Sequence, residues 1–372
     1  MPVQHTASGP GAPTSAPPSI GAHYTDTSTG DQYLAKGTAS VADWVKQGAG
    51  PEVRFYRTDW TDISFNGPPR GFLAAAESID AVIGVGYGLI KTTSGFDRKE
   101  IIGTGTQFTA VAWSDSLGKG VAMASVYDDG SASNLAVPYT SSSDGETWTA
   151  GTMTTFYVSD GALVWAEGIG KFVAGIQTNG NADYGYAYSS DGVNWDTVAG
   201  GTGSGIFRMR WIEQLGLLVA MRYASGALEV ITSPDAQVWT VAASITAAST
   251  TLADIAWSPA LGRALISTHA GEAYYCDTET LGTWTKLTIP SGGSGGNMLW
   301  IDELSAFVGV GNAGDGKRQG LVSRDGKSVE ERVGGGSTAA YTSLVWSAAH
   351  KTLFAGASSY LGTGVPLVVA VP

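Results

Sequence analysis

The sequence is poor in charge and has no long apolar run. Only 15% of its 372 residues are charged, and 33 acidic residues against 21 basic ones give a formal net charge of −12. Nucleic-acid binders concentrate lysine and arginine on one surface, so this balance argues against nucleic acid as a partner. No run of about 18 apolar residues occurs, so the sequence predicts no membrane insertion.

Cysteine, clustered histidine and recognisable catalytic motifs are also lacking. The single cysteine, Cys276, excludes an intrachain disulfide and a cysteine-based zinc site. The four histidines are scattered, so we predict no metal site and no cofactor. The motifs GxSxG, HExxH and the P-loop are absent, and we expect a protein that is not an enzyme. The first residues have neither a basic start nor an apolar core, so we expect no Sec-type signal peptide.

Glycine, tryptophan and tyrosine are abundant, at 52, 12 and 15 residues. This mixture is typical of many short strands joined by tight turns. One phrase recurs along the sequence: an apolar run ends in tryptophan, a turn follows, and a second run of small apolar residues starts eight residues after the tryptophan. The tryptophans of this phrase are Trp113, Trp165, Trp211, Trp257, Trp300 and Trp346, and a weaker copy has Ala75 in their place.

The spacing of these copies predicts the fold. Between Ala75 and Trp346 the mean period is about 45 residues, which is the length of one four-stranded propeller blade. We therefore predict an all-β fold, a seven-bladed β-propeller of four-stranded blades over residues 51–372. The last repeat is one strand short, and the strand-like segment Glu52–Phe65 has no blade of its own. We expect this N-terminal strand to close the last blade, because closure removes exposed sheet edges.

A serine–aspartate–glycine turn recurs between the outer strands of the repeats, as in Ser142–Trp148 and Ser189–Trp195. The aspartate would accept backbone N–H groups, the glycine would take a positive φ, the serine would add a capping bond and the tryptophan would pack on the outer face. These turns resemble the Asp-box (BNR) repeats of sialidase-like propellers, shortened because aspartate and glycine are adjacent here. We predict a structural role for them, at the end of the ring opposite the ligand face.

A ligand face is expected where the loops between blades meet the loops that join second and third strands. Aromatic, amide and charged side chains there suit sugar binding or a protein contact. The candidates are Tyr157, Asp160, Asn179, Asp183, Tyr184, Arg208, Arg222, His269, Arg318 and Tyr341.

The resemblance leaves a catalytic alternative open. A sialidase needs three arginines around a carboxylate, a tyrosine with a partner glutamate, and an acid. The loops between blades carry arginine only at Arg70 and Arg208, and the other face loops supply carboxylates. A sialidase-like glycan hydrolase with a carboxylate pair is therefore the alternative.

The first fifty residues differ in character from the repeats. Residues 1–19 are rich in Pro, Gly, Ser and Thr and are expected to form a flexible arm. In residues 20–50, two short strands would pair Tyr24 with Tyr33 as a hairpin, and a further segment ends at Trp44. A piece of this size cannot bury a core of its own, so we expect it to dock on something else.

The phrase HYTDTSTGDQYLAKGTASVADW resembles short modules of tailed-bacteriophage virion proteins, in which Y-x-D-T-x-T-G-x-x-Y is followed by G-T-x-x-x-x-D-W. The attachment residues would include Tyr24, Asp26, Tyr33 and Trp44. The resemblance implies a virion protein of a tail, fibre or head surface, assembled in the bacterial cytoplasm and oligomeric on the particle. Its partners would be other virion proteins and a host-surface glycan. A bacterial assembly-factor propeller is a third hypothesis.

Overall fold

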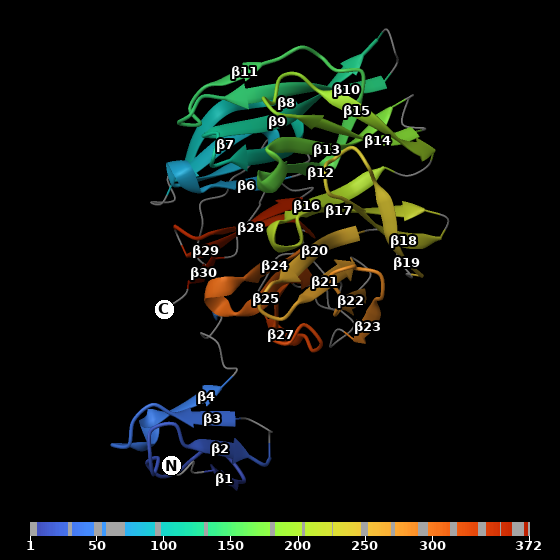
Figure 1. The fold of residues 1–372 in the computed structure, drawn as a ribbon. Helices are drawn as coiled ribbons and strands as arrows, with labels where there is room; N and C mark the ends of the chain where they lie inside the picture. Colours follow the sequence, from blue (N-terminus) through green and yellow to red (C-terminus); the bar gives the residue numbers. More distant parts are fainter. Residues whose placement is uncertain are drawn as a thin grey trace. The chain divides into compact units, whose positions relative to one another are not determined.

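The structure is a computed structural model whose regular elements are strands joined by turns (Figure 1). It describes residues 6–28, 32–47, 54–56, 71–93, 98–129, 133–178, 183–202, 205–224, 226–246, 252–268, 272–288, 297–312, 318–333, 340–349, 351–358 and 368–370. Among these residues, no helix reaches the length and apolarity that crossing a membrane requires.

The protein divides into two compact units. The first comprises Met1–Glu52 with Glu303–Ser305 and Pro372, and the second comprises Val53–Asp302 with Ala306–Val371.

The N-terminal unit contains one four-stranded sheet of order β1–β2–β3–β4. β1 (Thr6–Gly9) runs parallel to β2 (His23–Asp26), and β3 (Gln32–Ala35) is antiparallel to both β2 and β4 (Trp44–Gln47), which follows the short helix η1 (Val41–Asp43). The predicted pairing of Tyr24 with Tyr33 is confirmed. Part of the expected flexible arm, Thr6–Gly9, is a strand of this sheet.

The second unit repeats an antiparallel four-stranded sheet. Apart from the sheet that pairs β30 with β5, its sheets follow one another along the sequence, and each keeps the order of its strands in the sequence. Four of them are β12–β15 (Tyr157–Ala166, Lys171–Thr178, Asp183–Ser189, Asp196–Thr202), β16–β19 (Ile206–Ile212, Leu217–Ala224, Ala227–Ser233, Thr240–Ile245), β20–β23 (Leu252–Ser258, Arg263–Thr268, Glu272–Cys276, Thr285–Thr288) and β24–β27 (Met298–Ile301, Ala306–Asn312, Arg318–Ser323, Glu330–Val333).

Two further repeats merge into one six-stranded sheet, made of β6 (Phe72–Ala76), β7 (Ala81–Thr93), β8 (Arg98–Ser114), β9 (Lys119–Asp128), β10 (Ser133–Ser141) and β11 (Trp148–Ala150). β7 folds back on itself, because a Cβ added to Gly84 would lie 3.0 Å from Ile90 Cγ1, whereas six residues of straight strand span roughly 20 Å. β8 pairs with β7 through its first part and with β9 through its second part. The sheet is therefore two consecutive repeats that share β8.

The first strands of the repeats form a closed ring. β6 lies beside β8, β8 beside β12, and the series continues through β16, β20 and β24 to β28 (Ala340–Ser347), which lies beside β6 again. Ser343 Oγ donates to the Gly71 carbonyl at 3.0 Å, and the backbone N–H groups of Ala348 and Ala349 donate to the Glu77 carboxylate at 2.9 and 3.0 Å. Residues about 270 positions apart thus join the two ends of the unit.

The first and last strands of the unit meet at the last sheet. β28 pairs with β29 (Thr352–Ser358), which lies beside β30 (Val368–Ala370), and β30 pairs antiparallel with β5 (Arg54–Tyr56). β5 belongs to the segment Glu52–Phe65 that we expected to close the ring, and the rest of that segment lies outside the described residues. The observed pairing therefore brings an N-terminal strand onto a C-terminal one.

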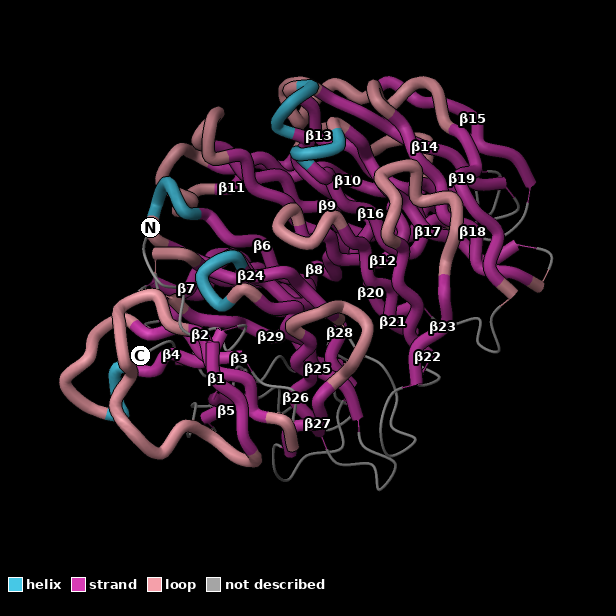
Figure 2. The backbone as a smooth tube through the Cα atoms, turned by 60° about the horizontal axis from the view of Figure 1, so that its bottom comes forward, coloured by secondary structure: helices cyan, strands magenta, loops and turns pink. Residues whose placement is uncertain are grey.

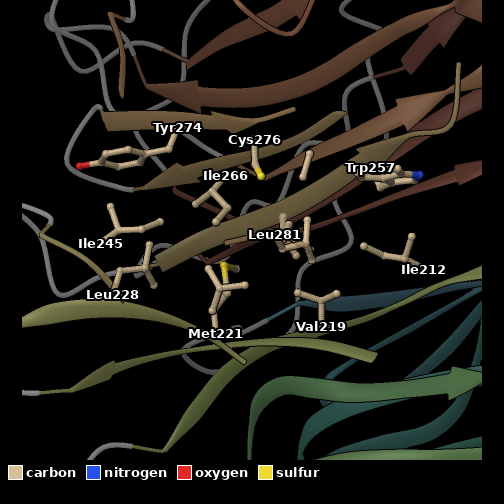
Figure 3. Close-up of a cluster of buried hydrophobic side chains, with 13 residues drawn as sticks. Ile212, Val219, Met221, Leu228, Ile245, Trp257, Ile266, Tyr274, Cys276 and Leu281 are labelled. Atoms are coloured by element: carbon tan, nitrogen blue, oxygen red, sulfur yellow. The ribbon is translucent and has the colours of Figure 1, made fainter. Parts of the chain in front are cut away.

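The core lies between neighbouring sheets. Figure 3 shows one such layer, in which Val219 and Met221 from β17 and Leu228 from β18 lie opposite Ile266, Tyr274 and Cys276 of the next sheet. The residues eight positions after the repeated tryptophans are all buried: Val121, Val173, Val219, Leu265, Val308 and Phe354. Second strands therefore contribute the centre of each layer, as the repeat predicted.

In four repeats a three-residue 3-10 helix forms the turn between the first and second strands. They are η2 (Glu77–Ile79), η3 (Glu167–Ile169), η5 (Glu213–Leu215) and η7 (Asp302–Leu304), drawn in cyan in Figure 2. Three of the six repeated indole N–H groups are bonded there: Trp165 donates to Glu167, Trp211 donates to Glu213, and Trp300 donates to Asp302 at 2.6 Å. A carboxylate two residues after the tryptophan thus fixes its ring at the end of the strand.

Candidate functional site

The serine–aspartate–glycine turns are closed by their own hydrogen bonds. In the third repeat, Ser189 Oγ accepts the Gly192 N–H at 2.8 Å, and Asp191 Oδ1 accepts the next two backbone N–H groups, each at 2.8 Å. The Trp195 indole donates to the Gly192 carbonyl at 3.1 Å. These polar groups of the turn bond to one another, which fits the predicted structural role.

The position of Gly192 keeps its left-handed backbone in other repeats even where it is not glycine. Ala236 has a φ of 67° and Leu281 a φ of 55°, and their carbonyls accept the indole N–H groups of Trp239 and Trp284 at 3.0 and 2.8 Å. The turn is therefore defined by its bonds more than by its glycine.

The turns also bind the preceding sheet. Lys119 Nζ donates to the Asp191 carbonyl at 3.3 Å, Lys171 Nζ donates to the Asp235 carbonyl at 3.3 Å, and Arg263 donates to the Asp325 carbonyl. Lys119 directly follows the turn between the first and second strands of its repeat. The aspartate turns and those first turns therefore share one end of the ring, as expected.

Replacing Asp191 with alanine should lower stability by about 1–2 kcal/mol at pH 7, because backbone N–H groups lose their acceptor. Burial alone would raise the pKa of Asp191, but hydrogen bonds from Asn194 and Val193 outweigh it and hold the pKa well below its ordinary value. A depressed folded-state pKa stabilises the fold above the unfolded pKa of about 3.9 and loses that effect as pH falls through the folded value. The difference in denaturation midpoint between variant and wild type should therefore be smaller at pH 3 than at pH 7.

Asp196, an exposed residue at the start of β15, provides the matched control. Its replacement with alanine should leave both midpoints nearly unchanged. Equal losses for the two variants would contradict a special role of the turn.

Three of the predicted ligand-face residues meet at the opposite end of the ring. The Tyr157 hydroxyl donates to Asp160 Oδ1 at 3.2 Å, and Arg208 Nη1 donates to the Asp160 carbonyl at 2.9 Å. The Arg208 guanidinium also lies over the Phe72 ring, 5.5 Å from its centre. Strands β6, β12 and β16 thus contribute to one cluster at the mouth of the ring.

Three other candidates meet further out, between the third and fourth repeats. The Arg222 guanidinium lies 4.2 Å from the centre of the Tyr184 ring and donates through Nε to Glu229 at 2.7 Å. Asp183 and Tyr184 line a cavity of about 350 Å³ between β13, β14 and β15. Arg222 in this group already contacts the Tyr184 ring and the Glu229 carboxylate.

The remaining candidates are not placed in either group. Asn179 and His269 lie outside the described residues. Arg318 begins β26 and Tyr341 lies in β28, and only the backbone of these two residues is described.

The expected attachment residues organise the N-terminal sheet. Asp26 is buried, and its Oδ1 accepts the N–H groups of Gly11 and Ser28, each at 2.9 Å. The Trp44 indole donates to the Ser15 carbonyl at 2.9 Å. The Tyr24 ring lies 6.1 Å from that of Tyr33 and 5.9 Å from that of Trp44, measured between centres. These four side chains hold together strands that are otherwise too short to be stable alone.

A cavity of about 300 Å³ lies inside the ring of first strands. Three charged residues line it: Arg208, Arg210 and Asp254. Arg210 Nε donates to Asp254 Oδ1 at 2.9 Å and Nη2 donates to Oδ2, which makes a two-pronged ion pair between β16 and β20. Burial lowers the pKa of the Arg208 guanidinium, while Asp254 counteracts this effect.

Sequence reasoning missed Arg210 and Asp254, although the repeat contains the signal. One residue before the tryptophan the other copies carry Ala112, Val164, Ala256, Leu299 and Val345. Arginine at this position, and aspartate three residues before Trp257, are departures that point to the ring interior.

A tyrosine–glutamate pair of the kind a sialidase requires occurs at β22. The Tyr274 hydroxyl donates to Glu272 Oε2 at 3.0 Å, and the other carboxylate oxygen is paired with Lys286. Burial first, and then Glu272, raise the pKa of Tyr274 to about 12. The hydroxyl therefore stays protonated at neutral pH. Among the described residues, no group of three or more His, Cys, Asp or Glu side chains could hold a metal ion.

No protein-family model and no curated protein matches the sequence. Solved structures match the fold. A structure of YCF48 bound to D1 peptide has a TM-score of 0.58 at 14% identity, over 86% of this protein and 100% of that one. The GH74 xyloglucanase from Xanthomonas campestris has a TM-score of 0.62 at 12% identity, over 85% of this protein and 55% of that one.

A component of a mitotic checkpoint complex also matches, with a TM-score of 0.62 at 12% identity, over 86% of this protein and 94% of that one. Together with the repeated four-stranded sheets, these similarities show an all-β fold of the β-propeller type. Identities this low indicate fold alone.

Proposed function

We propose that this protein is a non-catalytic structural and binding protein of a tailed-phage particle. The N-terminal unit attaches it to other virion proteins, and the propeller presents its ligand face to a host-surface glycan or braces neighbouring virion proteins. The observation that carries the proposal is the division into a small, separately hydrogen-bonded unit and a large ring. This is the organisation of an anchor and a displayed module.

The propeller in this proposal has seven blades of the Asp-box type. Its seventh blade would comprise β28, β29 and β30 together with the N-terminal β5. The closed series of first strands and the β5–β30 pairing support this count. A ring closed in this way presents no long free edge, which suits a protein exposed on a particle.

Contact with a polypeptide is a reasonable use of such a ring, since one of the similar structures holds a peptide. The ligand face offers Tyr157, Asp160 and Arg208 at its mouth, which are aromatic and charged groups of the kind found in protein and sugar contacts.

Particle incorporation tests the attachment. We expect a variant that lacks residues 1–50 to be missing from purified virions by mass spectrometry, while its melting temperature stays that of the intact propeller. Asp26→Ala, which removes the buried acceptor of the N-terminal sheet, should reduce incorporation at least severalfold. Leu117→Ser, a change at an exposed propeller residue, should not. Normal incorporation of the deletion variant would overturn the proposal.

A sialidase-like glycan hydrolase is the alternative that the aspartate turns leave open, although Tyr274 and its partner Glu272 are buried between sheets and the raised pKa of Tyr274 does not suit a nucleophile. Release of fluorophore from a sialoside by the wild type would support hydrolysis. Retention on a glycan array without any released product would support binding alone.

A further inference from the structure

β15 is an exposed strand at the edge of its sheet. It is the last strand in the order β12–β15, and within the described part of the chain it pairs with β14. Figure 2 shows β15 on the outer side of this sheet. An edge strand presents a row of N–H and C=O groups without partners, and this row is a template for a further strand.

The outer strands of the next three sheets differ from β15 in charge and length. β23 carries Lys286, and β27 carries Glu330, Glu331 and Arg332. Charged side chains on an edge oppose the addition of another strand. β15 has no charge after its first residue and is seven residues long, whereas β19 is also uncharged but has six residues. Charge therefore does not protect β15, although its edge is the longest of the four.

A cavity of about 350 Å³ adjoins this edge. Three of its lining residues, Ile176 of β13, Gly185 of β14 and Ala199 of β15, lie directly opposite one another across the sheet. Residues paired in this way project from one face, so the central glycine leaves a gap between the other two side chains. A Cβ on Gly185 would lie 2.5 Å from the Val198 carbonyl oxygen, so the backbone does not admit a larger residue there.

The lining of this cavity is mainly apolar. Ile176, Val198 and Ala199 contribute aliphatic groups, and Gly185 and Gly201 contribute backbone. Such a lining favours an apolar side chain over a charged one, and the volume lies at the lower end of the range of ligand pockets. A second copy that paired through its own β15 would present valine as its largest apolar side chain. The cavity therefore suits a strand of a different polypeptide with a larger apolar side chain.

We propose that an extended segment of a partner polypeptide adds to the edge of β15 and inserts a large apolar side chain, such as leucine or phenylalanine, into the adjoining cavity. In this mode of recognition, main-chain hydrogen bonds supply affinity, and a pocket for one of the alternating side chains supplies specificity. The inference concerns the outer edge of one sheet. It does not depend on attachment to a particle or on glycan binding at the mouth of the ring.

Synthetic strands test this proposal on the full-length protein by fluorescence anisotropy. The probes are capped, labelled heptapeptides of threonine and lysine with leucine, isoleucine, methionine, phenylalanine or alanine at the centre. We expect at least one large apolar centre to bind more than about tenfold tighter than alanine. The same peptide with its inner amides N-methylated should not bind, because it lacks the donors of a strand. No preference over alanine, or equal binding of the N-methylated peptide, would overturn the proposal.

A lysine on the edge tests the strand pairing. Thr197 is exposed and occupies the position that Lys286 holds in β23, two residues after the tryptophan of the turn. Thr197→Lys should weaken binding of every peptide by at least about tenfold. Val241, the exposed equivalent in β19, provides the matched control, because Val241→Lys changes the net charge equally and should leave binding unchanged. Equal losses in the two variants would contradict docking on β15.

A larger side chain at Ala199 tests the cavity. Ala199 is exposed and lines the cavity, so Ala199→Leu should fill it from β15 while leaving the edge available. The preference for a large apolar centre should disappear, and the affinity for the alanine peptide should stay nearly unchanged, a pattern that a damaged fold does not produce. A preference that persists would place the side chain elsewhere and overturn the proposal. Dimerisation of the free protein that Thr197→Lys abolishes, measured by light scattering, would identify a second copy as the occupant and overturn it as well.

Discussion

A variant that starts at residue 57 should lose about 2–4 kcal/mol of stability relative to a variant that starts at residue 51, because it lacks β5. In its absence β30 loses the three residue pairs that join Val368–Ala370 to Arg54–Tyr56. Each lost ladder hydrogen bond costs about 1 kcal/mol, and an unpaired strand edge also invites association with other molecules. Melting temperature and size-exclusion profile should both change.

The comparison is matched because both variants lack the N-terminal sheet. Any contribution of that sheet to stability is therefore the same in the two, and the difference reports β5 alone. Ser343 and Glu77 still link the ends of the ring in both variants through their bonds to Gly71, Ala348 and Ala349. If the two variants melt at the same temperature, these bonds suffice and strand closure contributes nothing.

The repeat made much of this architecture predictable. A tryptophan with a second apolar run eight residues later located the buried second strands, since Val173, Val219 and Val308 are fully buried. Burial of a strand between two sheets requires small apolar side chains on both faces, and that requirement is visible in the sequence of every copy. The hairpin register of Tyr24 with Tyr33 was predictable because it is local.

Features that depend on distant partners were not predictable in the same way. The parallel pairing of Thr6–Gly9 with His23–Asp26 joins a segment whose composition is that of a flexible arm. The Arg210–Asp254 ion pair joins residues 44 positions apart in different repeats. This ion pair forms because the ring brings the first strands of neighbouring repeats together. No local sequence pattern shows that β16 and β20 lie side by side.

The conformation of the aspartate turns also depends on contacts with the neighbouring repeat, and this dependence can be measured. Gly192 has a φ of 77°, and a Cβ added there would lie 2.4 Å from Val121 Cγ2 of the preceding repeat. Gly216, at the end of η5, has a φ of 60° and no atom within 4 Å of an added Cβ. The two glycines share a left-handed backbone and differ in what surrounds them.

Gly216→Ala should therefore cost only the left-handed strain, about 1 kcal/mol, whereas Gly192→Ala should cost about 2–4 kcal/mol because it also overpacks the contact with Val121. Urea denaturation of the two variants measures the difference. The positive φ itself is tolerated in the equivalent turn, where Ala236 is buried. Any excess cost at Gly192 must therefore come from the neighbouring sheet.

A double-mutant cycle separates the two contributions. Val121→Ala removes the nearest methyl group that a new Cβ would meet and leaves Thr140 Cγ2 at 3.2 Å, so the cost of Gly192→Ala should fall most of the way to that of Gly216→Ala when Val121 is already alanine. An unchanged cost would place the strain within the turn itself. A reduced cost would mean that the aspartate turn packs against the preceding sheet. The repeated turn would then stabilise the ring through this contact between neighbouring sheets.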